Sequence, residues 1–156
     1  MRYDKHKYQT GDVVAFAGQG FISEIIKLTT NCDYSHVGIL VVKGNDVFCY
    51  ESTSKQYTPD TLFTNEWYRG VHCFQFFERV LTYPGKVAVF PLKKKLPNED
   101  KLVEWLENNH TNHTAFNVSG MTTLGLRKIG LKLLETSDEE ELMFCSQMVT
   151  SGLKVV

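Results

Sequence analysis

Short apolar runs, separated by turn-forming residues, recur along the chain between Val13 and Pro91. Runs of this length, rich in valine and phenylalanine, are typical of strands. Turn signals such as Gly11-Asp12 precede or follow them. The pattern therefore predicts strands over five ranges: 13–17, 37–42, 47–52, 71–77 and 86–91.

Other stretches carry apolar residues at helical spacing. Residues 21–30 place three isoleucines on one face of a predicted helix. Asn98 is a candidate N-cap for a second helix, which is expected to fray at Asn108-Asn109. A short helical piece is expected over 61–67, and a last short helix ends at Gly152.

Length and composition predict one α+β domain over residues 1–156. The chain has 156 residues, of which 42% are hydrophobic and 12% aromatic. A chain of this size forms one hydrophobic core, and this apolar content argues against a disordered protein. We therefore expect a small antiparallel sheet packed against helices.

Charge and hydropathy argue against several classes of partner. The formal net charge is −1, so nucleic-acid binding is not expected. No apolar run approaches the roughly 20 residues that span a bilayer. The polar start of the chain lacks the apolar core of a signal peptide. We therefore expect a cytoplasmic protein or, for a viral one, the host cytoplasm or the virion.

The four cysteines are expected to be reduced, because none forms a CxxC pair and no secretory signal is visible. Cys49 and Cys73 lie in apolar runs, where burial disfavours the thiolate. We expect these two and Cys32 to be unpaired and unreactive.

Cys145 differs, because it lies where the last helix is expected to begin. A cysteine in the first turn of a helix ionises more easily, since the positive end of the helix dipole favours the thiolate. Ser137 and Glu140 have the spacing of a capping box, which would start the helix earlier. We interpret that acidic stretch as a separate turn ending near Met143.

His36 follows Ser35 in a polar turn, directly before the apolar run 37–42. An imidazole at the mouth of a strand lies at a sheet edge, and its ordinary pKa near 6.5 suits proton transfer at neutral pH. A single histidine in such a place is more often a hydrogen-bonded turn residue than a catalytic base.

Glu51 is predicted to lie beside His36 by the geometry of a hairpin. Gly44-Asn45 is a favoured two-residue loop, and in that register Gly38 lies opposite Glu51. Side chains alternate along a strand, so His36, Gly38 and Glu51 share one face. A one-residue shift would separate the pair, and a solvated strand-end carboxylate is the alternative interpretation of Glu51.

Two further features predict structure rather than chemistry. His110 and His113 have a spacing that suits a metal, but no further ligand is close, so we expect a polar loop and no metal or other cofactor.

Residues 121–134 are apolar and basic. A helix packed on the core is the favoured interpretation, and a lid or a helix at a membrane surface is the alternative.

Five blocks of the sequence together resemble a known family. The blocks are 11–14 (GDVV), 21–26 (FISEII) with Thr29-Thr30, 34–38 (YSHVG), Glu51 and 145–149 (CSQMV). They are similar to the circularly permuted branch of the NlpC-type papain-like cysteine peptidases. This branch includes YiiX-like and poxvirus-type proteins and is related to lecithin:retinol acyltransferase. In it the histidine and the polar residue precede the cysteine, as they do here.

The resemblance implies a permuted papain-like fold and a role for each of three residues. Cys145 would be the nucleophile, His36 the general base and Glu51 the carboxylate that orients the imidazole. An activity of this kind needs no metal and no organic cofactor. The predicted reaction is hydrolysis of a peptide, amino-acid or cell-wall amide bond through a thioester.

The residues that would bind substrate or the oxyanion follow from the same resemblance. The candidates are Tyr34, Ser35, Asn117 and Ser146. Relatives often carry a tyrosine before the cysteine helix, where this chain has Phe116. In place of that tyrosine hydroxyl, a backbone N–H at Cys145, or Asn117, would bind the oxyanion. Two alternative functions stay open: a lipid acyl hydrolase or acyltransferase, with membrane-surface contact through 121–134, and an inactive binding domain.

Overall fold

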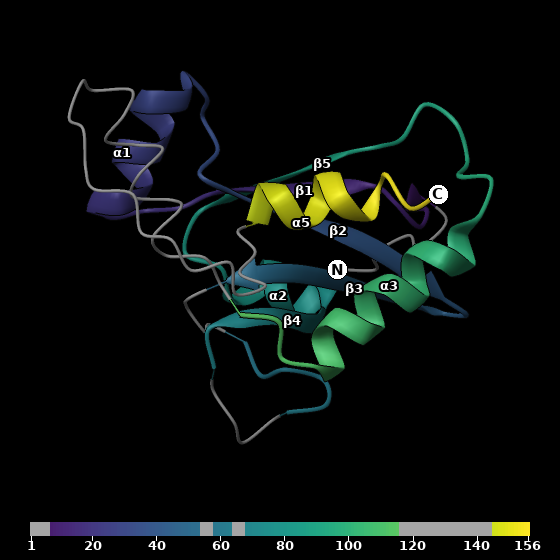
Figure 1. The fold of residues 1–156 in the computed structure, drawn as a ribbon. Helices are drawn as coiled ribbons and strands as arrows, with labels where there is room; N and C mark the ends of the chain where they lie inside the picture. The colour runs from purple at the N-terminus through teal and green to yellow at the C-terminus, as the bar shows by residue number, and fades with distance from the viewer. Residues whose placement is uncertain (1–6, 54–57, 64–67, 116–144) are drawn as a thin grey trace, which may run out of the picture.

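In a computed structural model of the protein, residues 7–53, 58–63, 68–115 and 145–156 are described. Figure 1 shows a curved sheet with helices on both of its faces. The sheet has five strands in the order β4-β3-β2-β1-β5, and all neighbours are antiparallel. The strands are β1 (Val13–Ala17), β2 (His36–Lys43), β3 (Asp46–Thr53), β4 (Gly70–Gln75) and β5 (Lys86–Phe90).

Four helices are described around this sheet. They are α1 (Phe21–Thr30), α2 (Phe76–Thr82), α3 (Glu99–Thr111) and α5 (Cys145–Gly152). The prediction of an α+β fold with an antiparallel sheet and covering helices is therefore confirmed. None of the helices in the described part of the chain has the length and apolar character needed to cross a bilayer.

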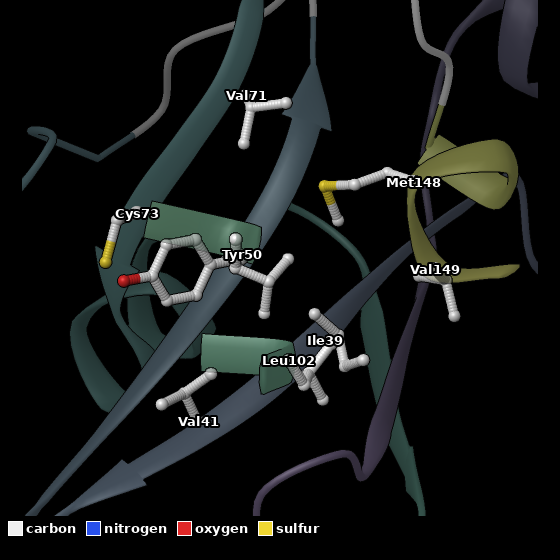
Figure 2. Close-up of a cluster of buried hydrophobic side chains, with 9 residues drawn as sticks. Ile39, Val41, Tyr50, Val71, Cys73, Leu102, Met148 and Val149 are labelled. Carbon is white, nitrogen blue, oxygen red and sulfur yellow. The ribbon is translucent and has the colours of Figure 1, made fainter. Parts of the chain in front are cut away.

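Each face of the sheet has its own apolar core. Figure 2 shows one core, in which Ile39 and Tyr50 of the sheet pack against Leu102 of α3 and Met148 of α5. The opposite face packs Phe16, Leu40 and other apolar side chains against Phe76 of α2. Alternation along the strands produces this division, because neighbouring residues of one strand point to opposite faces. The helices α2 and α5 therefore lie on opposite sides of the sheet.

The predicted hairpin between β2 and β3 is confirmed, including its register. Lys43 pairs with Asp46 and Ile39 pairs with Tyr50. Gly44 has a φ of 60°, the left-handed conformation that a tight two-residue turn needs and that glycine adopts without strain. This turn sets which residues of the two strands lie opposite each other.

The predicted strand over 71–77 is wrong at its end, because the chain changes from strand to helix at Gln75. The Gln75 side chain accepts a hydrogen bond from Phe77 N at 3.3 Å and so caps α2. Local propensity favours a strand through these aromatic residues. The structure has a helix instead, and its first residue, Phe76, is buried in the core.

Two helix predictions also need correction. Helix α3 does not fray at Asn108-Asn109 but continues to Thr111, and the Asn98 side chain makes no capping hydrogen bond. Residues 61–63 are not helical, so the helical piece expected over 61–67 is wrong in its described part. The remaining predictions concern residues outside the described ranges: 64–67, Phe116, Asn117, 121–134, and the capping box at Ser137 and Glu140.

Candidate active site

His36 and Glu51 are in direct contact on one face of the sheet. His36 is the first residue of β2, and its Nε2 lies 2.8 Å from Glu51 Oε2. The Glu51 side chain is fully buried, whereas 16% of the His36 side chain is exposed. The interpretation of Glu51 as a solvated carboxylate is therefore wrong. The imidazole keeps an opening to solvent while its partner is shielded from water.

Gly38 provides the space in which the Glu51 side chain lies. A Cβ atom at Gly38 would lie 2.9 Å from Glu51 Cγ and 2.8 Å from the Tyr50 carbonyl oxygen. Contacts this short are not tolerated in a packed interior. The hairpin register, together with the missing side chain at Gly38, therefore directs the carboxylate toward His36.

Cys145 is the first described residue of α5, and its thiol is hydrogen-bonded to the His36 side chain. The backbone N–H groups of Val37 and Ser146 also help to lower the pKa of the Cys145 thiol. Because Nε2 of His36 is occupied by Glu51, the ring nitrogen that remains for the thiol is Nδ1. The structure thus brings together Cys145, His36 and Glu51, which are far apart in the sequence.

The surroundings of Cys145 and His36 favour an ion pair. Burial raises the pKa of the Cys145 thiol, but the charge of His36 and the hydrogen bonds to the sulfur outweigh it and the pKa is lowered. Burial likewise lowers the pKa of His36, but Cys145 and Glu51 outweigh it and raise the pKa to about 9. Between these two pKa values the pair is a thiolate and an imidazolium.

Arg79, which the sequence interpretation did not identify, completes the contacts of Glu51. Its Nε and Nη2 donate to the two carboxylate oxygens of Glu51, each at 2.8 Å. Burial raises the pKa of Glu51, but Arg79 and then His36 outweigh it and hold the pKa at about 2. No motif indicates Arg79, which lies on α2, a helix that the sequence did not predict.

The proposed substrate-binding residues have varied surroundings. The Ser35 hydroxyl accepts a hydrogen bond from Gly18 N at 3.1 Å, which ties the turn before β2 to the end of β1. The half-buried Tyr34 ring packs edge-on against Phe90 of β5 at 5.7 Å. Ser146 is exposed next to Cys145. Their roles stay predictions.

The other cysteines are free thiols, and two of them are buried. Burial and the neighbouring Glu51 raise the pKa of the Cys49 thiol, which donates to Glu51 Oε1 at 3.4 Å. Burial also raises the pKa of Cys73. Cys32 is exposed. The expected burial of Cys49 and Cys73 is thus confirmed, and their unreactivity stays a prediction.

A second buried polar cluster joins α3 to the β4 edge of the sheet. The Asp60 carboxylate accepts hydrogen bonds from His72 Nδ1 and His110 Nε2, both at 2.9 Å, and from Cys73 N at 3.0 Å. His110 is buried within α3, so the prediction of a polar loop there is wrong. The cluster fastens α3 and the loop that contains Asp60 to β4.

One cavity of about 440 Å³ lies between α3 and the sheet face opposite His36. Its lining includes Tyr50 and Cys73 of the sheet and His110 of α3, with Lys43 and Glu107 also contributing. None of Cys145, His36 and Glu51 lines it. This cavity is therefore separate from the candidate active site.

Comparison with known proteins gives a partial match in sequence and a broad match in fold. No family model matches the chain. Over 52 residues the chain is 36% identical to the uncharacterized protein YiiX of Escherichia coli K12, a match that covers 33% of this chain and 26% of YiiX.

A solved structure extends the match in fold. The crystal structure of the metalloprotein YiiX from Escherichia coli O157:H7 superposes with a TM-score of 0.64, covering 94% of this chain and 64% of that one at 19% identity. The chain thus spans less than two thirds of either relative. At this identity the superposition shows the fold, which is YiiX-like.

Proposed function

We propose that this protein, which has a YiiX-like fold, is a cysteine-dependent hydrolase that cleaves an amide bond. The observation that carries the proposal is the line of contacts from Cys145 through His36 to Glu51. A nucleophilic thiol, a base and a group that orients the base are the parts that such catalysis requires. We also propose that the fold is the permuted NlpC-type one, in which the histidine and carboxylate precede the cysteine.

The proposed reaction proceeds in two halves. The Cys145 thiolate attacks the carbonyl carbon, and a tetrahedral oxyanion forms. His36, as the imidazolium, then donates its proton to the leaving amine while the C–N bond breaks and a thioester remains. In the second half, His36 takes a proton from water, which attacks the thioester and releases the acid and the thiolate. Glu51 stabilises the imidazolium throughout.

The oxyanion needs a hydrogen-bond donor, which we assign to the backbone N–H of Cys145. The first N–H groups of a helix have no partner within the helix, and the dipole there favours negative charge. Loss of one such donor typically costs about 100- to 1000-fold in rate. A chain with phenylalanine where relatives often have tyrosine is therefore expected to be a slower enzyme.

A metal has no part in this proposal, although the solved Escherichia coli relative is described as a metalloprotein. Within the described residues, no group of three or more His, Cys, Asp or Glu side chains is placed to hold a metal. The cluster of Asp60, His72 and His110 does not fit one, because Asp60 is saturated with hydrogen bonds and His72 uses both ring nitrogens.

A thiol-directed probe and a substrate panel test the proposal together. Iodoacetamide at pH 6, followed by peptide mapping, should label Cys145 ahead of the exposed Cys32. Wild type should hydrolyse at least one member of a panel of peptide amides, amino-acid amides and acyl esters. Cys145→Ala should hydrolyse none, and Cys32→Ala, the matched control, should behave as wild type. An inert Cys145 together with no turnover would favour the inactive binding domain.

The panel also separates the proposed amidase from the lipid alternative. Turnover of long-chain acyl esters without turnover of any amide would replace the amidase by an acyl hydrolase. The residues that motivate that alternative, 121–134, lie outside the described ranges.

A further inference from the structure

Four side chains of alternating charge follow one another through the candidate active site. Cys145 contacts His36, His36 contacts Glu51 at 2.8 Å, and Glu51 contacts Arg79 through two hydrogen bonds of 2.8 Å. As thiolate, imidazolium, carboxylate and guanidinium they sum to zero charge. Arg79 is the far end of this line and lies on α2, across the sheet from α5.

The Arg79 guanidinium is buried in a largely apolar environment. Its side chain is 1% exposed. The guanidinium carbon lies 5.1 Å from the ring centre of Phe16, 5.2 Å from that of Phe74 and 4.9 Å from that of Tyr83. A buried charge is costly unless it is paired. A planar guanidinium stacked on rings is also fixed in orientation, which a lysine ammonium is not.

The two hydrogen bonds fix the Glu51 carboxylate from behind. Arg79 Nη2 shares Glu51 Oε2 with His36 Nε2, and Arg79 Nε takes Oε1. A bidentate pair sets the plane of the carboxylate as well as its distance. The oxygen that faces His36 is therefore held in place by Arg79.

We infer that Arg79 is a positioning residue: it keeps Glu51 ionised and aimed at His36, so that the proton stays on the imidazole and Cys145 stays a thiolate. The inference rests on the thiolate–imidazolium pair of the proposed function. Without Arg79, two anions would flank one imidazolium in a buried site, and one of them would take up a proton. Protonation of either Cys145 or Glu51 reduces the thiolate at neutral pH.

The other groups that face Glu51 do not replace Arg79. Cys49 of β3 is a protonated thiol, because burial raises its pKa, and it carries no charge to offset a carboxylate. His72 of β4 lies opposite Glu51 in the ladder, but its two ring nitrogens bind Asp60 and the Tyr68 carbonyl. Among the described residues that contact the carboxylate, Arg79 supplies the permanent positive charge.

The test measures the Cys145 thiolate and needs no substrate. The rate of Cys145 alkylation by iodoacetamide, read by peptide mapping, is followed against pH in wild type, Arg79→Gln and Arg79→Lys. Arg69→Gln, which changes an exposed arginine, is the control. We expect the pH midpoint of Cys145 alkylation to rise by about one pH unit or more in Arg79→Gln. At low pH this corresponds to about tenfold slower alkylation. Arg79→Lys should lie between, and the control should match wild type.

A double-mutant comparison separates positioning from plain structural support. Glu51→Gln/Arg79→Gln carries neither buried charge, so it is the variant that folds if Arg79→Gln alone does not. If Arg79 acts through Glu51, the double variant should have the alkylation profile of Glu51→Gln. A further shift in the double variant, or an unchanged profile in folded Arg79→Gln, overturns the inference.

These outcomes are distinct from a failure of the proposed function. A low thiol midpoint that depends on Arg79, in a protein that hydrolyses no substrate, supports the inference and argues against the hydrolase. A low pH midpoint of alkylation that does not change in the Arg79 variants, in a protein that hydrolyses substrate, argues against the inference and supports the hydrolase. An ordinary thiol midpoint in wild type overturns both, because it removes the ion pair itself.

Discussion

Gly38 and Glu51 lie so close that a methyl group at Gly38 would lie 2.9 Å from Glu51 Cγ. The same methyl group would lie 2.9 Å from the Cys49 sulfur and 2.8 Å from the Tyr50 carbonyl oxygen. Backbone atoms cannot yield to it, so the added atom would displace the Glu51 side chain. Gly38 does not have a positive φ. Glycine is therefore required at this position for lack of space and not for its backbone conformation.

Gly38→Ala should therefore damage the site and the core together. Overpacking of a buried position typically costs about 1–3 kcal/mol, which urea unfolding measures. Alkylation of Cys145 at pH 6 should slow as well, because Glu51 is pushed from His36. Gly44→Ala is the control: it has open space but a φ of 60°, so it should lose stability without changing alkylation. An unaltered alkylation rate in Gly38→Ala would contradict the role given to Gly38.

Cys145→Ala and His36→Ala should each abolish turnover, and their effects should not add. Nucleophile and base act as one unit, so each single loss should cost about 10⁴-fold or more in kcat, and the double variant little beyond that. Both should fold, as circular dichroism would show, because each truncates a side chain that is only partly buried. Turnover that persists in Cys145→Ala would refute the mechanism.

Glu51→Gln should be milder in catalysis and harsher in stability than Cys145→Ala. The amide keeps the size and one acceptor, so His36 is still oriented, but the charge that stabilises the imidazolium is gone. Arg79 would then be a buried cation without its carboxylate, and breaking a buried pair typically costs about 3–5 kcal/mol. Urea midpoints and kcat for the two variants decide this. Equal stability of Glu51→Gln and Cys145→Ala would show that another group compensates the buried charge of Arg79.

Alkylation and turnover should depend differently on pH. Alkylation needs only the thiolate, so it should rise with pH through the lowered pKa of Cys145 and then level off. Turnover also needs protonated His36 as acid, so it should fall again as pH rises through about 9. The folded pKa of His36 lies above its ordinary 6.5, so its contribution to stability is full below 6.5 and lost by about 9. An alkylation midpoint near that of a free thiol would contradict the ion pair.

Asp60→Asn should unfold the protein more readily without acting on Cys145 directly. The carboxylate is buried, and the hydrogen bonds from His110 and His72 outweigh burial and hold its pKa well below the usual range. It therefore contributes stability above its unfolded pKa, which is lost as pH falls. We expect a loss of about 1.5–3 kcal/mol at pH 7 in urea unfolding, the range typical of a hydrogen bond to a charged group. Asp46→Asn, at an exposed hairpin position, is the control and should change stability little. An equal loss in both variants would contradict the stabilising role given to the hydrogen bonds of Asp60.

The part of the site that local rules control was predictable from the sequence. The Gly44-Asn45 turn fixes the register of β2 and β3, and strand alternation then brings His36 and Glu51 to one face. Such an argument needs only a short loop and a period of two. Burial of Glu51 could not be predicted in this way, because the residues that cover it come from distant parts of the chain.

Arg79 and Asp60 were missed for a common physical reason. Arg79 lies on α2, a helix that was not predicted and whose first two residues fell within the predicted strand 71–77. Its aromatic neighbours come from β1, from β4 and from the residue after α2. Asp60 joins His72 of β4 to His110 of α3 across long stretches of sequence. Pairs of this kind depend on tertiary packing, which no periodicity encodes.

The order of the four residues along the chain has a consequence for protein synthesis. His36, Glu51 and Arg79 are translated before Cys145, and each lies on a different secondary-structure element. A lowered thiol pKa needs the imidazole beside the sulfur, so a nascent chain carries an ordinary, weakly nucleophilic cysteine. The ion pair can form only when α5 docks on β2, so the proposed nucleophile would become reactive only after the last described helix has packed on the sheet.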